Sequence, residues 1–159
     1  MKTKLVKIMA PLVIACALLT MIAGAAAGQG GRSGRIQGVW ETQITLNDCA
    51  GHVIRSFDGM LTFHQGGTMM DGTTTPSALR TPAEGVWRNV GNNTYAFRMK
   101  SFTFNAQNIL TGWSIIAGEL TVDETGNTFT GPATVEVHDP NGVLLTTVCA
   151  DSSGTRFEL

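Results

Sequence analysis

The sequence has little charge and few of the residues on which most recognisable chemistry depends. Charged residues make up 14% of its 159 residues, so the clustered Lys and Arg of a nucleic-acid-binding surface are not expected. Only Asp48, Cys49 and His52 bring potential ligands together locally, too few for a zinc site. The chain also lacks a Gly-rich phosphate loop and a Ser-centred nucleophile elbow. We therefore predict no metal, no cofactor and no catalytic residue.

The beginning of the chain has the pattern of a bacterial signal peptide. Several lysines precede an almost wholly apolar stretch at residues 8–22, and the small residues Ala25, Ala26 and Ala27 follow it. This order is typical of a cleaved export signal. The sequence predicts a signal peptide at residues 1–27 and a soluble secreted or periplasmic protein that is not stably inserted in a membrane after cleavage.

A lipoprotein signal is the alternative interpretation of the same segment. Residues 13–16 match the short pattern in which Cys16 would become lipidated and membrane-bound. The apolar run continues beyond this cysteine, whereas a lipoprotein would normally turn polar there. Retention as a transmembrane anchor is also disfavoured, because the apolar run is short and ends in a cleavage-like site.

The rest of the chain is predicted to be a flexible arm followed by one domain. Residues 28–37 begin with Gly, Ser and Arg and should form the arm. Residues 38–159 are enough for a single domain that buries roughly two-thirds of its unfolded surface without a metal. All 12 Asp and Glu of the chain lie after the leader, so the exported part is acidic and offers no basic footprint for nucleic acid.

The pattern of the domain is that of antiparallel β-structure. Gly-, Asn- and Pro-rich turn clusters separate segments rich in Val, Ile, Thr, Phe and Trp, and no helical period follows the leader. Alternation places Phe57, Leu61 and Phe63 inside and His64 outside. The first strand should likewise face the core with Trp40, Thr42, Ile44 and Leu46. Further strands are expected at residues 68–72, 85–90, 94–105, 112–122, 128–137, 143–149 and 154–159.

Two segments depart from simple alternation. Phe97 and Met99 share one parity, but Phe102 and Phe104 share the opposite one, which predicts a β-bulge or bend around residues 100–101. The link at residues 71–84 has no regular period and should be a surface loop. It is either a lid over a barrel mouth or a connection without a function.

The two ends of the domain are predicted to pair with each other. In an antiparallel pair the residue numbers of partners have a nearly constant sum. The sum for Trp40 and Arg156 differs by only two from the sum for Cys49 and Cys149, and a bulge or loop residue could absorb the difference. In an oxidising compartment the two cysteines should form a disulfide; the alternative is two separate buried thiols.

Three of these residues resemble a family signature. Gly38 and Trp40 form a Gly-x-Trp start, and Arg156 lies near the end of the chain, as in the calycin superfamily, which includes the lipocalins. The resemblance implies an up-and-down barrel of eight or nine strands in which Trp40 plugs one end, Arg156 packs across its ring, and Gly38 allows a close approach. The Thr-Asp-Tyr motif and C-terminal helix of larger lipocalins are missing, so the chain looks like the short bacterial lipocalin-like proteins. Allene oxide cyclase-like and dirigent-like barrels remain alternatives.

The interior offers the best prediction of function. Its aromatic and sulfur side chains either fill the barrel or line a cavity for a small hydrophobic molecule. A protein that binds or sequesters such a ligand is the favoured hypothesis. A cyclase-type enzyme and a ligand-free structural or oligomeric envelope protein are the alternatives, and the oligomeric state is left open. The candidate lining residues are Phe57, Phe63, Phe97, Met99, Phe102, Phe104, Trp113 and Phe129.

Overall fold

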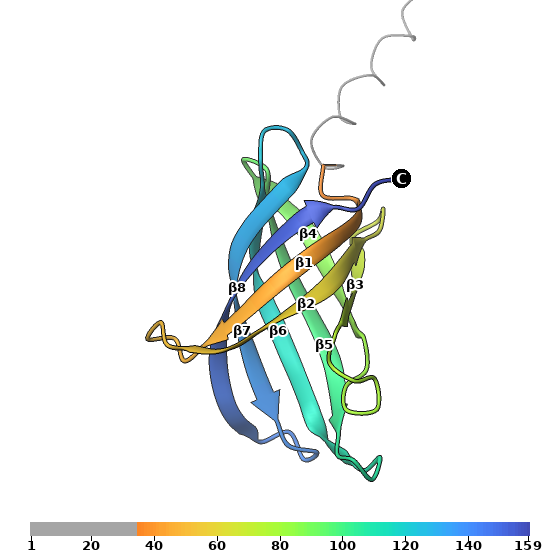
Figure 1. Ribbon diagram of the computed structural model, residues 1–159, viewed down its shortest axis with the longest axis vertical. Helices are drawn as coiled ribbons and strands as arrows, with labels where there is room; N and C mark the ends of the chain where they lie inside the picture. Colours follow the sequence, from red (N-terminus) through yellow and green to blue (C-terminus); the bar gives the residue numbers. More distant parts are fainter. Residues whose placement is uncertain (1–34) are drawn as a thin grey trace, which may run out of the picture. The chain divides into compact units, whose positions relative to one another are not determined.

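The chain forms a closed barrel of eight antiparallel strands, each paired with the next and the last paired with the first (Figure 1). The computed structural model describes residues 35–159; the predicted signal peptide, Cys16 and residues 28–34 of the predicted arm lie outside the described residues. The expected all-β, up-and-down architecture is confirmed. The strands are β1 (Gly38–Asn47), β2 (Val53–Phe63), β3 (Thr68–Thr73), β4 (Ala83–Gly91), β5 (Thr94–Phe104), β6 (Leu110–Val122), β7 (Thr128–His138) and β8 (Leu144–Arg156).

Alternation of side chains builds the core as the sequence predicts in the first two strands. Trp40 and Thr42 are buried on β1 while Glu41 and Gln43 are exposed. On β2, Leu61 and Phe63 are buried, and the exposed His64 follows the end of the strand. Because one face of each strand is buried, a shift of one residue would expose the whole apolar set, which fixes the register.

The last strand is continuous, so the predicted interruption between residues 149 and 154 is wrong. β8 runs for 13 residues and pairs with both β7 and β1. Asp151 and Ser153 are exposed, as the outward positions of an unbroken alternation. Gly154 is buried against Phe129, because a Cβ at that glycine would lie 2.3 Å from the phenyl ring. The polar residues therefore cover the outer face of a strand and do not form a turn.

The bulge predicted near residues 100–101 is also absent. Partners of β5 and β6 follow one another without a break from Thr94 with Thr121 to Thr103 with Gly112. Ser101 is consequently buried and Phe102 is exposed, so Phe102 faces outward and not inward as expected. The only register shift between these two strands comes later, between Thr103 and Phe104.

The two ends of the barrel differ in their loops. We call the end with the chain's C-terminus, where β1 begins and β8 finishes, the closed end; residues 64–67, 92–93 and 123–127 connect strands there (Figure 1). The opposite, open end carries the connections at residues 48–52, 74–82, 105–109 and 139–143. Within residues 35–159 there is no helix long and apolar enough to cross a membrane.

Candidate functional site

Trp40 and Arg156 meet at the closed end, in the register that the sequence predicts. They are direct partners in the ladder between β1 and β8. The guanidinium carbon of Arg156 lies 4.2 Å from the centre of the Trp40 ring, a cation–π contact. Trp40 is fully buried, donates its indole N–H to the Ile36 carbonyl at 2.8 Å and packs its ring edgewise on Phe129. Ile36 belongs to the predicted arm, yet it is fully buried in this plug.

Arg156 also binds three main-chain carbonyls, from two segments, at the closed end. Its Nε donates to the Gly126 carbonyl at 2.9 Å, Nη1 donates to the Gln37 carbonyl at 2.8 Å, and Nη2 donates to the Arg35 carbonyl. Gly38 makes room for this side chain: its φ is 121°, and a Cβ there would lie 2.9 Å from Nη1. One arginine thus seals this end by satisfying backbone acceptors.

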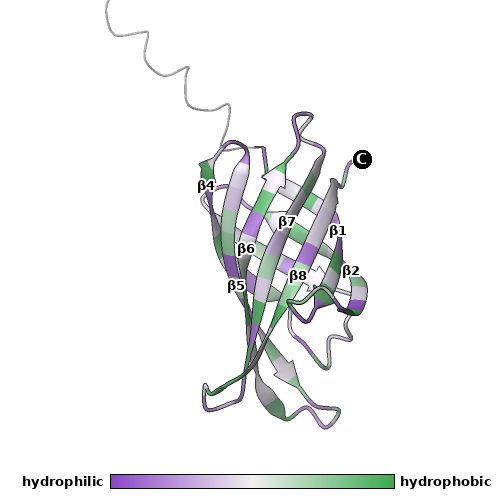
Figure 2. Cartoon of the chain, turned by 90° about the vertical axis from the view of Figure 1, so that its left-hand side faces the viewer, coloured by the Kyte–Doolittle hydropathy of each residue, from purple (hydrophilic) through white to green (hydrophobic). Residues whose placement is uncertain are grey.

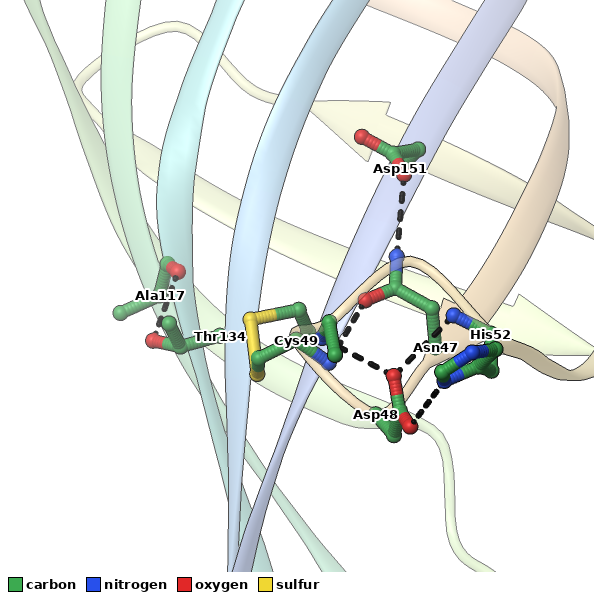
Figure 3. Close-up of a disulfide and its surroundings, with 9 residues drawn as sticks. Asn47, Asp48, Cys49, His52, Ala117, Thr134 and Asp151 are labelled. Carbon is green, nitrogen blue, oxygen red and sulfur yellow. Dashed lines mark hydrogen bonds and ion pairs between the residues drawn. A yellow bond between two sulfur atoms is a disulfide. The ribbon is translucent and has the colours of Figure 1, made fainter.

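The predicted disulfide is formed between Cys49 and Cys149, whose Cα atoms are 4.9 Å apart (Figure 3). Asn47 and Cys149 are the last partners of β1 and β8, so Cys49 lies two residues beyond the ladder. Cys49 adopts a φ of 63° there, and its amide donates to the Asn47 side chain. The sums of partner numbers therefore differ by two because Cys49 lies in the loop, two residues beyond Asn47. The bridge ties the first open-end loop to the middle of the last strand.

The neighbouring Asp48 and His52 stabilise this loop. Asp48 accepts hydrogen bonds from the His52 ring at 2.8 Å and from two backbone amides of the loop (Figure 3). The hydrogen bond with the His52 side chain, followed by those with the backbone amides, lowers the pKa of Asp48. No group of three or more His, Cys, Asp or Glu able to hold a metal occurs among residues 35–159.

A mainly apolar cavity of about 260 Å³ lies in the barrel toward the open end. Three predicted residues, Phe57, Phe97 and Met99, line it. A cavity of about 150 Å³ can accept one benzene ring, so this one has room for a molecule of one or two fused rings. Other apolar lining residues are Ile44, Leu46, Leu61, Ile116, Leu120, Ala133, Val135, Val137, Val148 and Ala150.

The other predicted lining residues lie elsewhere. Phe63 and Phe129 are buried among the residues of the closed end, against Trp87 and Trp40 respectively. Phe102 is 43% exposed. The Trp113 ring stacks on the His138 ring, with 5.8 Å between the two ring centres. Phe104 is half-buried at the end of β5 and does not line the cavity. The unbroken alternation of β5 explains the placement of Phe102.

A buried hydroxyl with no partner lies in the wall of the cavity. Thr42 is 5% exposed and lines the cavity, and its Oγ1 has no hydrogen-bond partner among the described residues. Ser101, fully buried on β5, has the same property. Burying a hydroxyl without a partner costs about 1–3 kcal/mol. A polar group on a bound molecule could recover part of that cost only if the Thr42 hydroxyl, which is buried in the wall, rotates toward the cavity.

An ion pair forms one wall of the cavity, and sequence reasoning missed it. Arg80 donates to both carboxylate oxygens of Asp71, at 3.0 and 2.8 Å, and the amide of Ala83 donates to the same carboxylate at 2.7 Å. Both charged residues line the cavity. Asp71 lies two residues after the buried Met69 on the same strand, so both side chains point inward. This spacing could have predicted the ion pair from the sequence, because an inward-facing acid in a barrel requires a partner.

The connection at residues 74–82 is attached to the barrel wall. The Thr81 amide donates to the Phe102 carbonyl at 3.0 Å, and the Phe104 amide donates to the Leu79 carbonyl at 2.9 Å. Leu79 and Arg80 line the cavity. The surface loop predicted at residues 71–84 is shorter than expected, because residues 71–73 belong to β3 and residues 83–84 to β4. The remaining connection continues the wall beside β5.

Comparison with known proteins identifies the fold alone. No protein-family model matches the sequence, and no curated protein matches it. Among solved structures, the one described as "Structure of EF1p2_mFAP2b bound to DFHBI" is similar with a TM-score of 0.52 and 14% sequence identity. The match covers 79% of this chain and 98% of that chain. The likeness is one of barrel architecture.

Proposed function

We propose that the protein is a secreted, lipocalin-like bacterial binding protein that carries or sequesters one small, largely apolar molecule in the open-end cavity. The observation that carries this proposal is the mainly apolar cavity of about 260 Å³ inside the barrel, with the unpartnered Thr42 hydroxyl buried in its wall. A barrel that only needed a filled core would gain stability from an apolar side chain at this position. The disulfide supports export, because such bridges persist in oxidising compartments.

The lining favours a neutral ligand with a single polar group. The charges of Asp71 and Arg80 are paired with each other through two hydrogen bonds. A charged ligand that paired with either residue would have to break this ion pair and leave the other residue uncompensated, which is costly in a buried site. Thr42 can donate to or accept from a hydroxyl or carbonyl group. We therefore expect a ligand of one or two rings that carries such a group.

Binding of 1-naphthol and naphthalene, measured by titration calorimetry, tests the proposal. One hydrogen bond to Thr42 should make 1-naphthol bind about two- to tenfold tighter than naphthalene. Thr42→Val keeps the shape of the side chain and should reduce that ratio to about one. If the unaltered protein binds neither compound, the proposal is wrong.

A matched pair of tryptophan substitutions locates the binding. Val135 lines the cavity, whereas Val86 is 60% exposed on the outer face of β4. Val135→Trp should fill the cavity and abolish binding, and Val86→Trp should leave it unchanged. Equal binding by both variants would place the ligand outside the cavity and contradict the proposal.

A further inference from the structure

Five exposed aliphatic side chains lie on two hairpin tips at the open end, and Val53 and Ile54 add two more on the neighbouring β1–β2 hairpin. Ile109 and Leu110 lie on the β5–β6 hairpin, and Val143, Leu144 and Leu145 lie on the β7–β8 hairpin; all five are between 39% and 61% exposed. Figure 2 shows green segments along the lower ends of these strands. The closed-end connections are instead built from residues such as His64, Gln65, Asn92, Asn93, Asp123 and Glu124.

The same two tips carry almost no charge. Residues 105–110 include no charged side chain, and residues 139–145 include only Asp139. The Asp139 carboxylate accepts hydrogen bonds from the amides of Asn141 at 2.9 Å and Val143 at 2.8 Å. Little unsatisfied charge would therefore have to leave water if the tips entered an apolar medium.

An aromatic and basic cluster lies just behind the tips, on the outer faces of β5, β6 and β7. Phe102 pairs with Trp113 across the ladder, and Trp113 pairs with His138. The Lys100 ammonium lies 4.2 Å from the Trp113 ring centre and 5.1 Å from that of Phe102. A Cβ at Gly142 would be 3.6 Å from Trp113, so the indole also packs against the β7–β8 turn. Trp and Lys at this position are typical of side chains at the boundary between acyl chains and headgroups.

We propose that the open end docks reversibly on an anionic lipid bilayer, with the β5–β6 and β7–β8 tips in the acyl-chain boundary and Lys100 and Trp113 among the headgroups. The order of side chains along the hairpins, uncharged aliphatic first and aromatic with basic next, matches the polarity profile of a bilayer surface. Lys100 supplies the charge complementary to an anionic headgroup, and the two nearby carboxylates are engaged within the protein, Glu136 with the His138 ring and Asp139 with two amides of its turn. A few aliphatic side chains give weak, reversible association. This docking is independent of whether the cavity binds a ligand.

Quenching of tryptophan fluorescence by brominated acyl chains tests the docking in the full chain. Trp40 and Trp87 are buried at the closed end, so Trp113 should account for the quenching by vesicles of phosphatidylcholine and phosphatidylglycerol. The apolar leader could itself bring the full chain to vesicles, which makes quenching of Trp113, and not flotation, the decisive signal. Trp113→Phe should remove the quenched component.

Aspartate substitutions at equally exposed positions test whether the two hairpin tips enter the bilayer. Ile109 and Leu145 are each 61% exposed and Val86 is 60% exposed, so none contributes a buried side chain. The double variant Ile109→Asp with Leu145→Asp should weaken vesicle-dependent quenching by roughly tenfold or more, and Val86→Asp should leave it unchanged. Equal quenching in all three proteins, or none in the unaltered protein, would overturn the proposal. It would also be overturned if sedimentation showed a dimer that only the double variant dissociates. Calorimetry with 1-naphthol without vesicles reports separately on the cavity.

Discussion

The closed and open ends of the barrel are built on opposite principles. At the closed end, Arg156 stacks on Trp40 and donates to three backbone carbonyls, and the Trp40 indole has its own acceptor. The apolar cavity opens toward the other end, and Thr42, near the middle of β1, is buried in its wall without a hydrogen-bond partner. The comparison shows that one end is sealed by hydrogen bonds and ring contacts, whereas the other leads to the cavity for which we propose ligand binding.

The largest expected effect concerns the covalent support of the open end. The disulfide closes a sequence separation of 100 residues. In the chain-entropy model, replacing both Cys49 and Cys149 by Ser should lower the free energy of unfolding by about 4 kcal/mol. Urea unfolding of the oxidised protein and the double variant measures the difference. Reductant should destabilise the former alone; an unchanged midpoint in the double variant would show that the open end does not depend on this bridge.

Removing the Arg156 side chain from the closed end should have the next largest effect on stability. Arg156→Ala removes the contact with Trp40 and leaves three carbonyls without this donor, which should cost about 3 kcal/mol. Unfolding followed by tryptophan emission should show both the loss of stability and a changed environment of Trp40. Arg98→Ala, at an exposed position on β5, is the control and should change little. If the two variants behave alike, Arg156 does not seal the barrel.

The smallest effect is expected at a closed-end turn at low pH. The Asp123 carboxylate accepts hydrogen bonds from the Thr125 hydroxyl, then from the amides of Thr128, Asn127 and Gly126, and these lower its pKa to about 2 from 3.8. Because the folded state binds this proton less readily, the stabilisation is complete above pH 3.8 and is lost as the pH falls toward 2.

Asp123→Asn isolates this contribution. The melting temperature of the unaltered protein should fall more steeply between pH 4 and pH 2 than that of the variant. Parallel curves for the two proteins would show that the turn does not depend on the Asp123 charge.

Much of the fold could be predicted from the alternation of apolar and polar residues and from the constant sum of partner numbers in antiparallel strands. The inward residues of β1 and the pairing of its ends with β8 depend on features that the sequence displays directly, namely period two and a constant sum of partner numbers. Phe102 was misplaced because the sequence pattern assigns large apolar residues to the interior. In the structure, Ser101 is buried and Phe102 contacts Lys100 outside.

The candidate site could be predicted only in part, because its polar features depend on contacts between distant strands. Phe57, Phe97 and Met99 were found by their parity and apolar character. The pairing of Asp71 with Arg80 requires the path of the connecting segment, which has no periodic pattern. The missing partner of the Thr42 hydroxyl likewise depends on the packing around it.

Native mass spectrometry of the protein purified from its own host tests the central claim most directly. Our account predicts one additional neutral molecule of one or two rings per chain, which Val135→Trp loses and Val86→Trp retains. A bare chain from the host, together with failure to take up added 1-naphthol, would contradict the assignment of the open-end cavity as a binding site.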